Sequence, residues 1–298
     1  MTPIHVTTWD ETGGQGPPAV FVHNIFTWGC DETYGFAAQR PLADRYRLLL
    51  VDRRGYGHSP DTARSDVEAD ADDLIALLTQ LPDLPDLPDQ PKTSEPSVLP
   101  EPTAPPEPSD LPGGRGGGAH LVGHGNGGVA AMLAAARRPD LVRSLTLIQP
   151  SAFTAAARHP AVAALLERVG EAAPGVPDSM TAQEFLRAST EGIGLPMPQP
   201  TAQRLRAVAT SMHERPIWEA QVPLEPLRTA PWPTLVICGT WQDAPEPYRT
   251  YVGEPLMACA EAVTEALGAR ARLLRVPGFY PHTEQPAAVN TALRQLWA

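Results

Sequence analysis

The sequence is poor in lysine and cysteine and contains no long hydrophobic run. Lys92 is the only lysine, so arginine supplies almost all of the positive charge, and the formal net charge is -11. No basic stripe runs along the chain, which argues against a nucleic-acid partner. The three cysteines, Cys30, Cys238 and Cys259, are too few and too scattered for a disulfide framework or a metal site. We therefore expect neither a metal nor another cofactor.

Features that would direct the chain to a membrane are also missing. The first ten residues lack a basic segment followed by an apolar core, and no apolar run approaches the roughly 18 residues that span a bilayer. We therefore expect a cytoplasmic protein without membrane association. A chain of 298 residues can bury a sizeable core, which favours one α/β domain with an insertion over two independent domains. Assembly into a homodimer stays open.

Short apolar runs alternate with helical segments along the chain. Strands are expected at residues 4–9, 19–23, 47–52, 121–123, 142–148, 234–239 and 271–276, and helices at 66–81, 129–138, 254–267 and 284–298. Uninterrupted apolar strands such as 19–23 are typical of the middle of a parallel sheet. The alternation predicts an α/β fold with a doubly wound, mostly parallel sheet.

Two segments depart from this alternation. Residues 81–118 contain eleven prolines, repeated Pro-Asp-Leu units and a glycine-rich run, and they predict a flexible, partly polyproline insertion. The insertion is either a docking segment or arm over a neighbour, or a tolerated surface insertion. Residues 151–230 are helix-forming and punctuated by proline. The chain therefore divides into a core half at 1–150 that carries the insertion, a second unit at 151–230, and a core half at 231–298.

A glycine cluster at residues 121–128, Leu-Val-Gly-His-Gly-Asn-Gly-Gly, predicts a strand, a sharp turn and a helix. This turn resembles the nucleophile elbow of the α/β-hydrolase superfamily, Gly-x-Ser-x-Gly. Gly123 and Gly127 match the flanking glycines, so Gly125 stands where the family has its catalytic serine. Asp52 to Ser59 resembles another turn of the family, Asp-x-x-Gly-x-Gly-x-Ser. The resemblance implies that 151–230 is a helical cap over the active site.

The histidine and acid of the family's triad are also altered or displaced. The family pattern Gly-His-x-Pro-His-x-Glu-x-Pro aligns with residues 278–286 and places Phe279 at the histidine position. A loop shortened by two residues would instead bring His282 into that role. The family's acid aligns with Gln242 when residues are counted forward from Gly239, and with Asp243 when they are counted back from Pro247. Because triad residues act as a unit, serine-type hydrolysis is excluded unless another nucleophile, such as Ser151 or Cys30, is used.

The resemblance implies that the backbone oxyanion donors remain. They are the amide of Asn126, which opens a helix, and an amide at Asn24 or Ile25. His23 matches the family's His-Gly oxyanion loop, in which Asn24 replaces the glycine. Gly125 relieves the strain of the elbow and is expected to open space for substrate. Catalytic candidates are Asn126, His124, Tyr280, His282 and Asp243, and the expected substrate-binding residues are His23, Asn24, Ile25, Trp28, Gly125, Phe153, Trp218, Trp241 and Phe279.

Three functions remain open. The first is a non-hydrolytic, cofactor-independent enzyme that acts on a hydrophobic, polyketide- or terpenoid-like molecule in natural-product biosynthesis. It would be a cyclase, pericyclic reactions included, or a lyase or dehydratase that uses His282 or Asp243 as acid or base. The second is a pseudo-hydrolase that binds a ligand or a partner without turnover. The third is an esterase with a displaced nucleophile.

Overall fold

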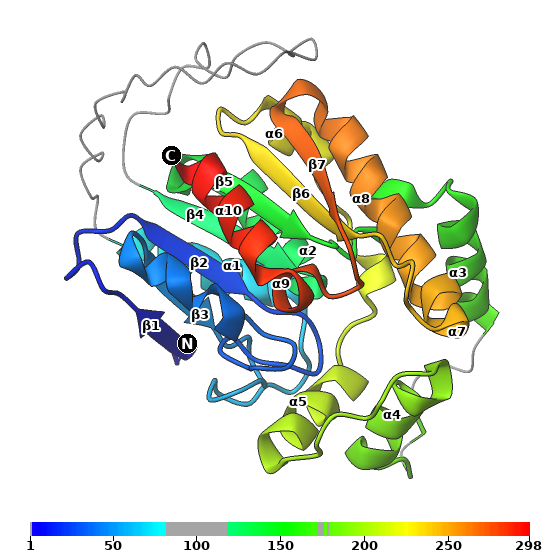
Figure 1. Ribbon diagram of the computed structural model, residues 1–298. Helices are drawn as coiled ribbons and strands as arrows, with labels where there is room; N and C mark the ends of the chain where they lie inside the picture. The colour runs from blue at the N-terminus through cyan, green and yellow to red at the C-terminus, as the bar shows by residue number, and fades with distance from the viewer. Residues whose placement is uncertain (1, 82–117, 172–175, 178) are drawn as a thin grey trace.

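A seven-stranded sheet forms the centre of the molecule (Figure 1), and the computed structural model describes residues 2–81, 118–171, 176–177 and 179–298. The strand order is β1-β3-β2-β4-β5-β6-β7, with β1 antiparallel to β3 and all other neighbours parallel. The strands are β1 Val6–Trp9, β2 Pro18–Val22, β3 Arg47–Val51, β4 Ala119–His124, β5 Val142–Ile148, β6 Thr234–Gly239 and β7 Ala271–Val276. The predicted doubly wound, mostly parallel sheet is confirmed. Most of the predicted insertion, residues 82–117, lies outside the described residues.

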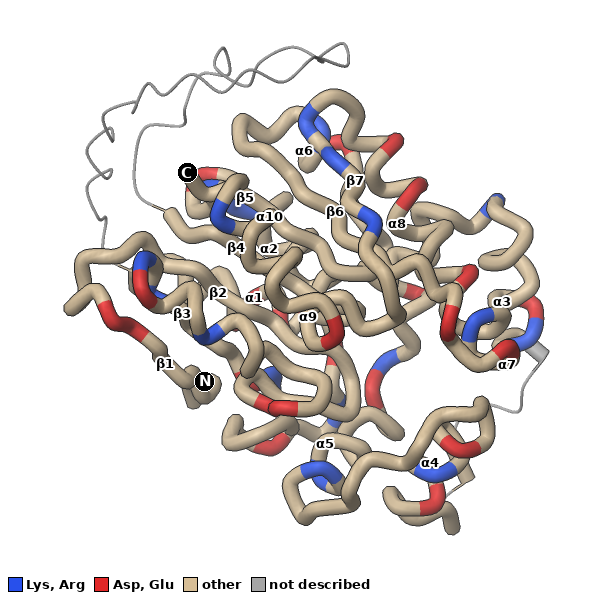
Figure 2. The backbone as a smooth tube through the Cα atoms, viewed as in Figure 1, with Lys and Arg blue, Asp and Glu red and all other residues tan. Residues whose placement is uncertain are grey.

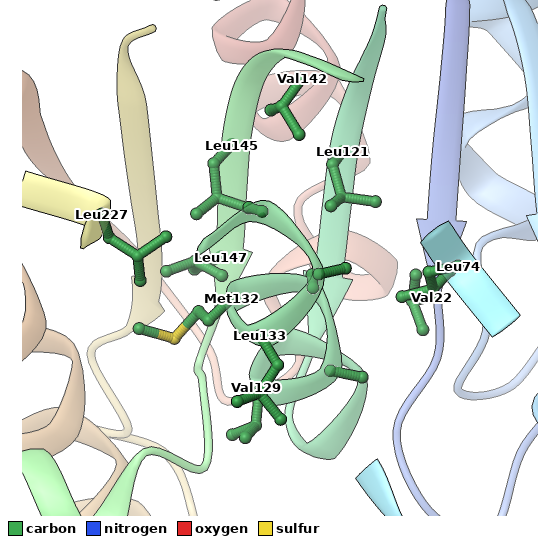
Figure 3. Packing of buried hydrophobic residues seen from close by; sticks show 14 of the residues in the cluster. Val22, Leu74, Leu121, Val129, Met132, Leu133, Val142, Leu145, Leu147 and Leu227 are labelled. Carbon is green, nitrogen blue, oxygen red and sulfur yellow. The ribbon is translucent and has the colours of Figure 1, made fainter. Parts of the chain in front are cut away.

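Alternate residues of each central strand enter two different cores. In β2, Val20 and Val22 face one core, whereas Ala19 and Phe21 face the other. The first core lies under α1 Val67–Gln80, α2 Asn126–Arg137, α6 Leu224–Thr229 and α8 Glu254–Leu267, and the second under the 3-10 helix Ala37–Asp44 and α10 Pro286–Trp297. Figure 3 shows Met132 of α2 among Leu145, Leu147 and Leu227 in the first core. Burial on both faces explains why β2 is apolar throughout.

Local sequence determines where the main helices begin. The side chain of Asp66 caps α1 by accepting the backbone N–H of Glu68, and acidic residues in the first turn suit the helix dipole. Helix α2 begins at Asn126, directly after the glycine turn. The predicted helix at 284–298 is α10, and it follows a separate short helix, α9 Pro281–Glu284. Pro286 begins the second helix because a proline fits the first turn but not a helix interior.

The segment that was expected to form a cap divides into two parts. Helix α3 Pro160–Glu171 packs on α8, and α6 packs on α2 and α8, so both belong to the layers beside the sheet. Helices α4 Ala182–Ala188 and α5 Ala202–Met212 pack on each other, apart from the sheet (Figure 1). Phe185 of α4 contacts Phe26, and Arg204 of α5 pairs with Asp31. Helices α4 and α5 therefore cover the loop that follows β2.

The remaining short elements connect these layers. They are α7 Glu246–Tyr248, a π-helical turn at Arg249–Gly253, and 3-10 turns at Pro139–Leu141, Phe153–Ala156, Glu191–Ile193, Ile217–Glu219 and Gly268–Arg270. Basic and acidic residues are interspersed over the backbone (Figure 2). Among the helices of the described residues, none is long and apolar enough to cross a membrane.

Candidate functional site

Backbone strain gathers at the carboxyl ends of the central strands. Among the described residues, the non-glycine residues with positive φ are Phe26 after β2, Gln149 after β5 and Trp241 after β6, at 62°, 46° and 58°. Gly125, which follows β4, has φ 55° as well. Such conformations cost a non-glycine residue energy, and they concentrate at functional sites. Four strand ends thus point to one edge of the sheet as the candidate site.

The turn at Gly125 has the geometry of a sharp strand-to-helix elbow. Its φ and ψ are 55° and -119°, a combination that an L side chain rarely adopts. Its N–H donates to the carbonyl of Ile148 at 3.0 Å, and its carbonyl accepts the N–H of Ser151 at 3.2 Å. Both neighbours lie at the end of β5 or just after it. These hydrogen bonds therefore hold the backbone of Gly125 in this conformation, although a glycine can adopt many others.

The side chain of Asn24 fills the space in front of the elbow. A Cβ atom built on Gly125 would lie 2.2 Å from Cγ and 2.3 Å from Oδ1 of Asn24. The prediction that Gly125 opens space for substrate is therefore wrong. The physical reason is that residue 24, a glycine in the family pattern, carries a carboxamide here, and that group takes the volume of the missing serine.

The oxyanion amide of the elbow is also occupied. The backbone N–H of Asn126 donates a 3.0 Å hydrogen bond to Oδ1 of Asn24. The expectation that this amide is free to polarise a carbonyl is therefore wrong. The acceptor is itself an amide carbonyl, so Asn24 takes the place that a substrate carbonyl would have in a hydrolase.

The predicted histidines are neutral groups inside the molecule. Nδ1 of His23 contacts the carbonyl of Asn24 at 2.6 Å, and its Nε2 accepts the N–H of Arg53 at 3.0 Å. Burial, with Arg53 adding to it, lowers the pKa of His23 to about 3. The rings of His124 and His282 lie 4.4 Å apart, and burial lowers the pKa of His282 to about 4 and that of His124 well below its usual value. Both ring nitrogens of His23 are thus bonded to backbone groups of the loops at Asn24 and Arg53.

Aromatic side chains occupy the place where the resemblance puts a catalytic histidine. The Phe279 ring packs against Trp241 and Tyr248, with centroids 5.9 and 5.6 Å apart. The hydroxyl of Tyr248 donates to that of Tyr280 at 2.9 Å, and Tyr280 also contacts Tyr34. Burial raises the pKa of Tyr280 well above its usual value, so the phenol stays protonated. The site thus has an aromatic wall and no base at residue 279.

A comparison with known proteins assigns the chain to a family. A profile of the alpha/beta hydrolase family matches residues 19–292. The chain belongs to the α/β-hydrolase family. Its sequence is 30% identical over 209 residues to the pimeloyl-[acyl-carrier protein] methyl ester esterase of Chromobacterium violaceum, covering 69% of this chain and 65% of the relative. It is 30% identical over 137 residues to the sn-1-specific diacylglycerol lipase ABHD11 of Mus musculus, covering 45% of this chain and 33% of the relative.

The fold agrees with this membership. A thermophilic esterase from Thermogutta terrifontis superposes with a TM-score of 0.56 at 22% identity, covering 99% of this chain and 94% of the esterase. At that identity the likeness concerns the fold alone. The matched region spans 65% and 33% of the two sequence relatives, so their activities do not transfer directly.

In this hydrolase-family chain, the strand end after β5 carries a residue that sequence reasoning missed. Gln149 is buried, and its Oε1 accepts from the N–H of Gly239 and from Nε1 of Trp241, at 3.0 Å each. Its Nε2 donates to the carbonyl of Phe279 at 3.1 Å. Asp243, the predicted acid, is exposed, and no hydrogen bond or ion pair joins it to another described residue. A polar residue directly after a buried strand was the available signal for Gln149.

A buried charged cluster beside the elbow was missed as well. Nε of Arg53 bonds Asp70 at 2.7 Å, and its Nη2 pairs with Glu214, which lies just after α5. The hydroxyl of Tyr56 donates to Glu214 at 2.5 Å, and Nδ2 of Asn126 donates to it at 3.2 Å. Burial, opposed by Arg53, raises the pKa of Asp70 to about 6. Nothing in the local sequence marks Glu214, because its partners lie far away in the chain.

The other predicted residues are spread over the structure. Trp28 is half-buried under the guanidinium of Arg204, 4.8 Å from its ring, and Ile25 lies in the same loop. Phe153 and Trp218 pack in a separate hydrophobic cluster against α3 and α8. The structure therefore brings Asn24, Gly125 and Asn126 together at the elbow. Phe153 and Trp218 belong to the separate cluster instead. In the described part of the chain, no group of three or more His, Cys, Asp or Glu is placed to hold a metal ion.

Proposed function

We propose that this α/β-hydrolase family member binds a ligand at the covered elbow without serine-dependent hydrolysis. One observation carries the proposal. The carboxamide of Asn24 both fills the nucleophile's volume at Gly125 and accepts the oxyanion N–H of Asn126. Ester hydrolysis requires an attacking atom and a free oxyanion donor. No group at this position provides either of them.

The state of the neighbouring groups supports the same proposal. A general base needs a pKa near the working pH, whereas burial holds His23, His124 and His282 in the neutral form well below that range. Phe279 has no proton acceptor in its side chain. The strained residues Phe26, Gln149 and Trp241 nevertheless keep the edge of the sheet in a costly conformation. A decayed scaffold has no reason to retain such strain, and a binding site does.

Cyclisation or elimination on a hydrophobic, polyketide-like molecule is the second candidate. The aromatic wall favours it, because Phe279 and Tyr280 are half-buried and the phenol of Tyr280 is protonated. A phenol can donate a hydrogen bond to a substrate carbonyl, and a shaped apolar wall can orient a flexible chain for reaction. Such chemistry needs no nucleophile.

Labelling with a fluorophosphonate probe, together with hydrolysis of p-nitrophenyl butyrate, tests the first proposal. We expect neither labelling nor turnover with the wild-type chain. The triple variant Asn24→Gly/Gly125→Ser/Phe279→His should gain labelling at residue 125, because it restores the nucleophile, its space and its base. The single variant Asn24→Gly is the matched control, since it opens the space without supplying a nucleophile. Labelling of the wild-type chain at Ser151 or Cys30 would support a displaced nucleophile and overturn the proposal.

Mass spectrometry of a metabolite extract separates binding from the second candidate. The extract comes from cells that lack this protein and is incubated with and without the purified chain. An isomer of unchanged mass indicates a cyclase, and loss of water or carbon dioxide indicates a lyase or dehydratase. A fraction that raises the melting temperature without changing composition indicates binding alone. Gain of water would contradict both candidates.

A further inference from the structure

Three donors of the core hold one carboxylate of the cap. The carboxylate of Glu214 pairs with Nη2 of Arg53 and accepts from the hydroxyl of Tyr56 at 2.5 Å and from Nδ2 of Asn126 at 3.2 Å. Its side chain is 5% exposed. Glu214 follows Met212, the last residue of α5, whereas the donors lie on the turn after β3 and on the first residue of α2. The carboxylate and its donors thus come from two different layers of the molecule.

The donors keep their positions without help from Glu214. Arg53 is bound by Asp70 at 2.7 Å and lies over the Tyr56 ring, 4.9 Å from its centroid. The Tyr56 ring packs in turn on His23, with centroids 5.1 Å apart. Nδ2 of Asn126 extends from a residue whose backbone is fixed by α2 and by Asn24. Donors that are already oriented bind an anion with little further loss of conformational entropy.

The charges of the cluster allow one carboxylate to replace another. Arg53 faces two carboxylates, Asp70 and Glu214, and its Nη1 is buried without a hydrogen-bond partner among the described residues. Exchanging Glu214 for an external carboxylate leaves the charge of the cluster unchanged. It also returns Glu214 to water and so recovers the hydration of that carboxylate. A guanidinium, a phenol and a carboxamide together form a charge-assisted donor set for an organic acid.

We propose that Arg53, Tyr56 and Asn126 form a binding site for an organic carboxylate, which Glu214 fills in this structure. The ligand's carboxylate takes the place of Glu214 when the segment after α5 lifts away from the core. This inference rests on the proposed function, because it names the ligand class of the same covered elbow. Asn126 links the two, since its backbone N–H faces Asn24 while its side chain faces Glu214.

Acetate binding to Glu214→Ala tests the donor set directly. The substitution removes the internal carboxylate and leaves its three donors. We expect acetate to raise the melting temperature of this variant in a saturable manner, beyond the effect of sodium chloride at equal ionic strength and of neutral acetamide. Wild type and Glu219→Ala are the controls. Glu219 lies on the same segment but is half-exposed and pairs with Arg215.

A second substitution assigns the binding to the proposed donors. In the Glu214→Ala background, Tyr56→Phe removes one hydrogen bond to the anion and should weaken acetate binding about tenfold. If Glu214→Ala is unfolded, folding upon addition of acetate, but not of chloride or acetamide, supports the proposal equally. A variant that acetate neither stabilises nor folds overturns it, as does an equal response in wild type. The fluorophosphonate result is independent of these outcomes, so failure of the proposed function and failure of this inference remain distinguishable.

Discussion

The side-chain carbonyl of Asn24 lies 3.0 Å from the backbone nitrogen of Asn126, and its Cγ lies 2.2 Å from the position of a Cβ on Gly125. Two departures from the family pattern, asparagine for glycine at 24 and glycine for serine at 125, are therefore one structural change. A side chain at residue 125 and the present conformation of Asn24 exclude each other. This coupling explains how the elbow keeps its backbone geometry without a side chain at residue 125.

Gly125→Ser alone is expected to destabilise the protein by about 2–5 kcal/mol, because it adds both backbone strain and a clash with Asn24. Combining it with Asn24→Gly should recover the part of this loss that is due to the clash. Urea unfolding of the two single variants and the double variant gives the coupling free energy. Gly192→Ser is the control, since a Cβ there meets nothing within 4 Å. Strictly additive losses would contradict the coupling.

Asp70→Asn and Glu214→Gln are expected to be mild one at a time and severe together. Each single variant leaves Arg53 with one carboxylate, so the buried cluster becomes neutral. The double variant leaves a buried guanidinium without a counter-charge, which costs about 3–5 kcal/mol. Urea unfolding at pH 7 of all four forms in this cycle measures the difference. If the double variant loses no more stability than the two single variants lose in total, the two carboxylates are not electrostatically coupled through Arg53.

The protein is expected to lose stability as the pH falls from about 6.5 toward 4. Burial lowers the pKa of His23 and His120 to about 3, that of His282 to about 4, and that of His124 well below its usual value. In the unfolded chain these groups titrate near their usual value of about 6.5, so unfolding at pH 5 takes up about four protons.

Asp70 acts in the opposite direction. The folded state raises its pKa to about 6, so its stabilising contribution is present at low pH and is lost as the pH rises through that value. The net uptake at pH 5 from these five groups is therefore about three protons. Urea unfolding at closely spaced pH values from about 4.5 to about 5.5 measures this uptake as the slope of the unfolding free energy against pH, and His120→Gln should reduce it by about one. A stability that does not change over this range would contradict the assignment.

Gln149→Ala is expected to cost about 2–4 kcal/mol of stability, because it leaves the N–H of Gly239 and Nε1 of Trp241 buried without an acceptor. Gln149→Glu keeps the acceptor but cannot donate to the carbonyl of Phe279, so an intermediate loss is expected. The measurement is the urea midpoint, with the exposed Gln295→Ala as a control that should change little. Equal stability of Gln149→Ala and wild type would show that Gln149 does not hold these loops.

The sequence alone determined the layers of this protein. Strands 142–148, 234–239 and 271–276 appear in the structure with the predicted bounds, because short runs rich in apolar and β-branched residues between turn residues are a local signal for strands. The glycine pattern around Gly125 also located the elbow, since few other residues tolerate a positive φ and a close helix approach there. Alignment with the family patterns was also enough to show that Gly125 and Phe279 stand at the positions of the catalytic serine and histidine.

Only the tertiary structure decided what fills the site. Whether Gly125 leaves a space depends on Asn24, which lies 101 positions earlier in the chain and reaches the elbow only when β2 and β4 pair. The Arg53–Glu214 pair joins residues 161 positions apart, and Gln149 meets Phe279 across 130. Local periodicity carries no signal for such contacts, because side-chain packing and pairing between distant segments are set by the fold as a whole.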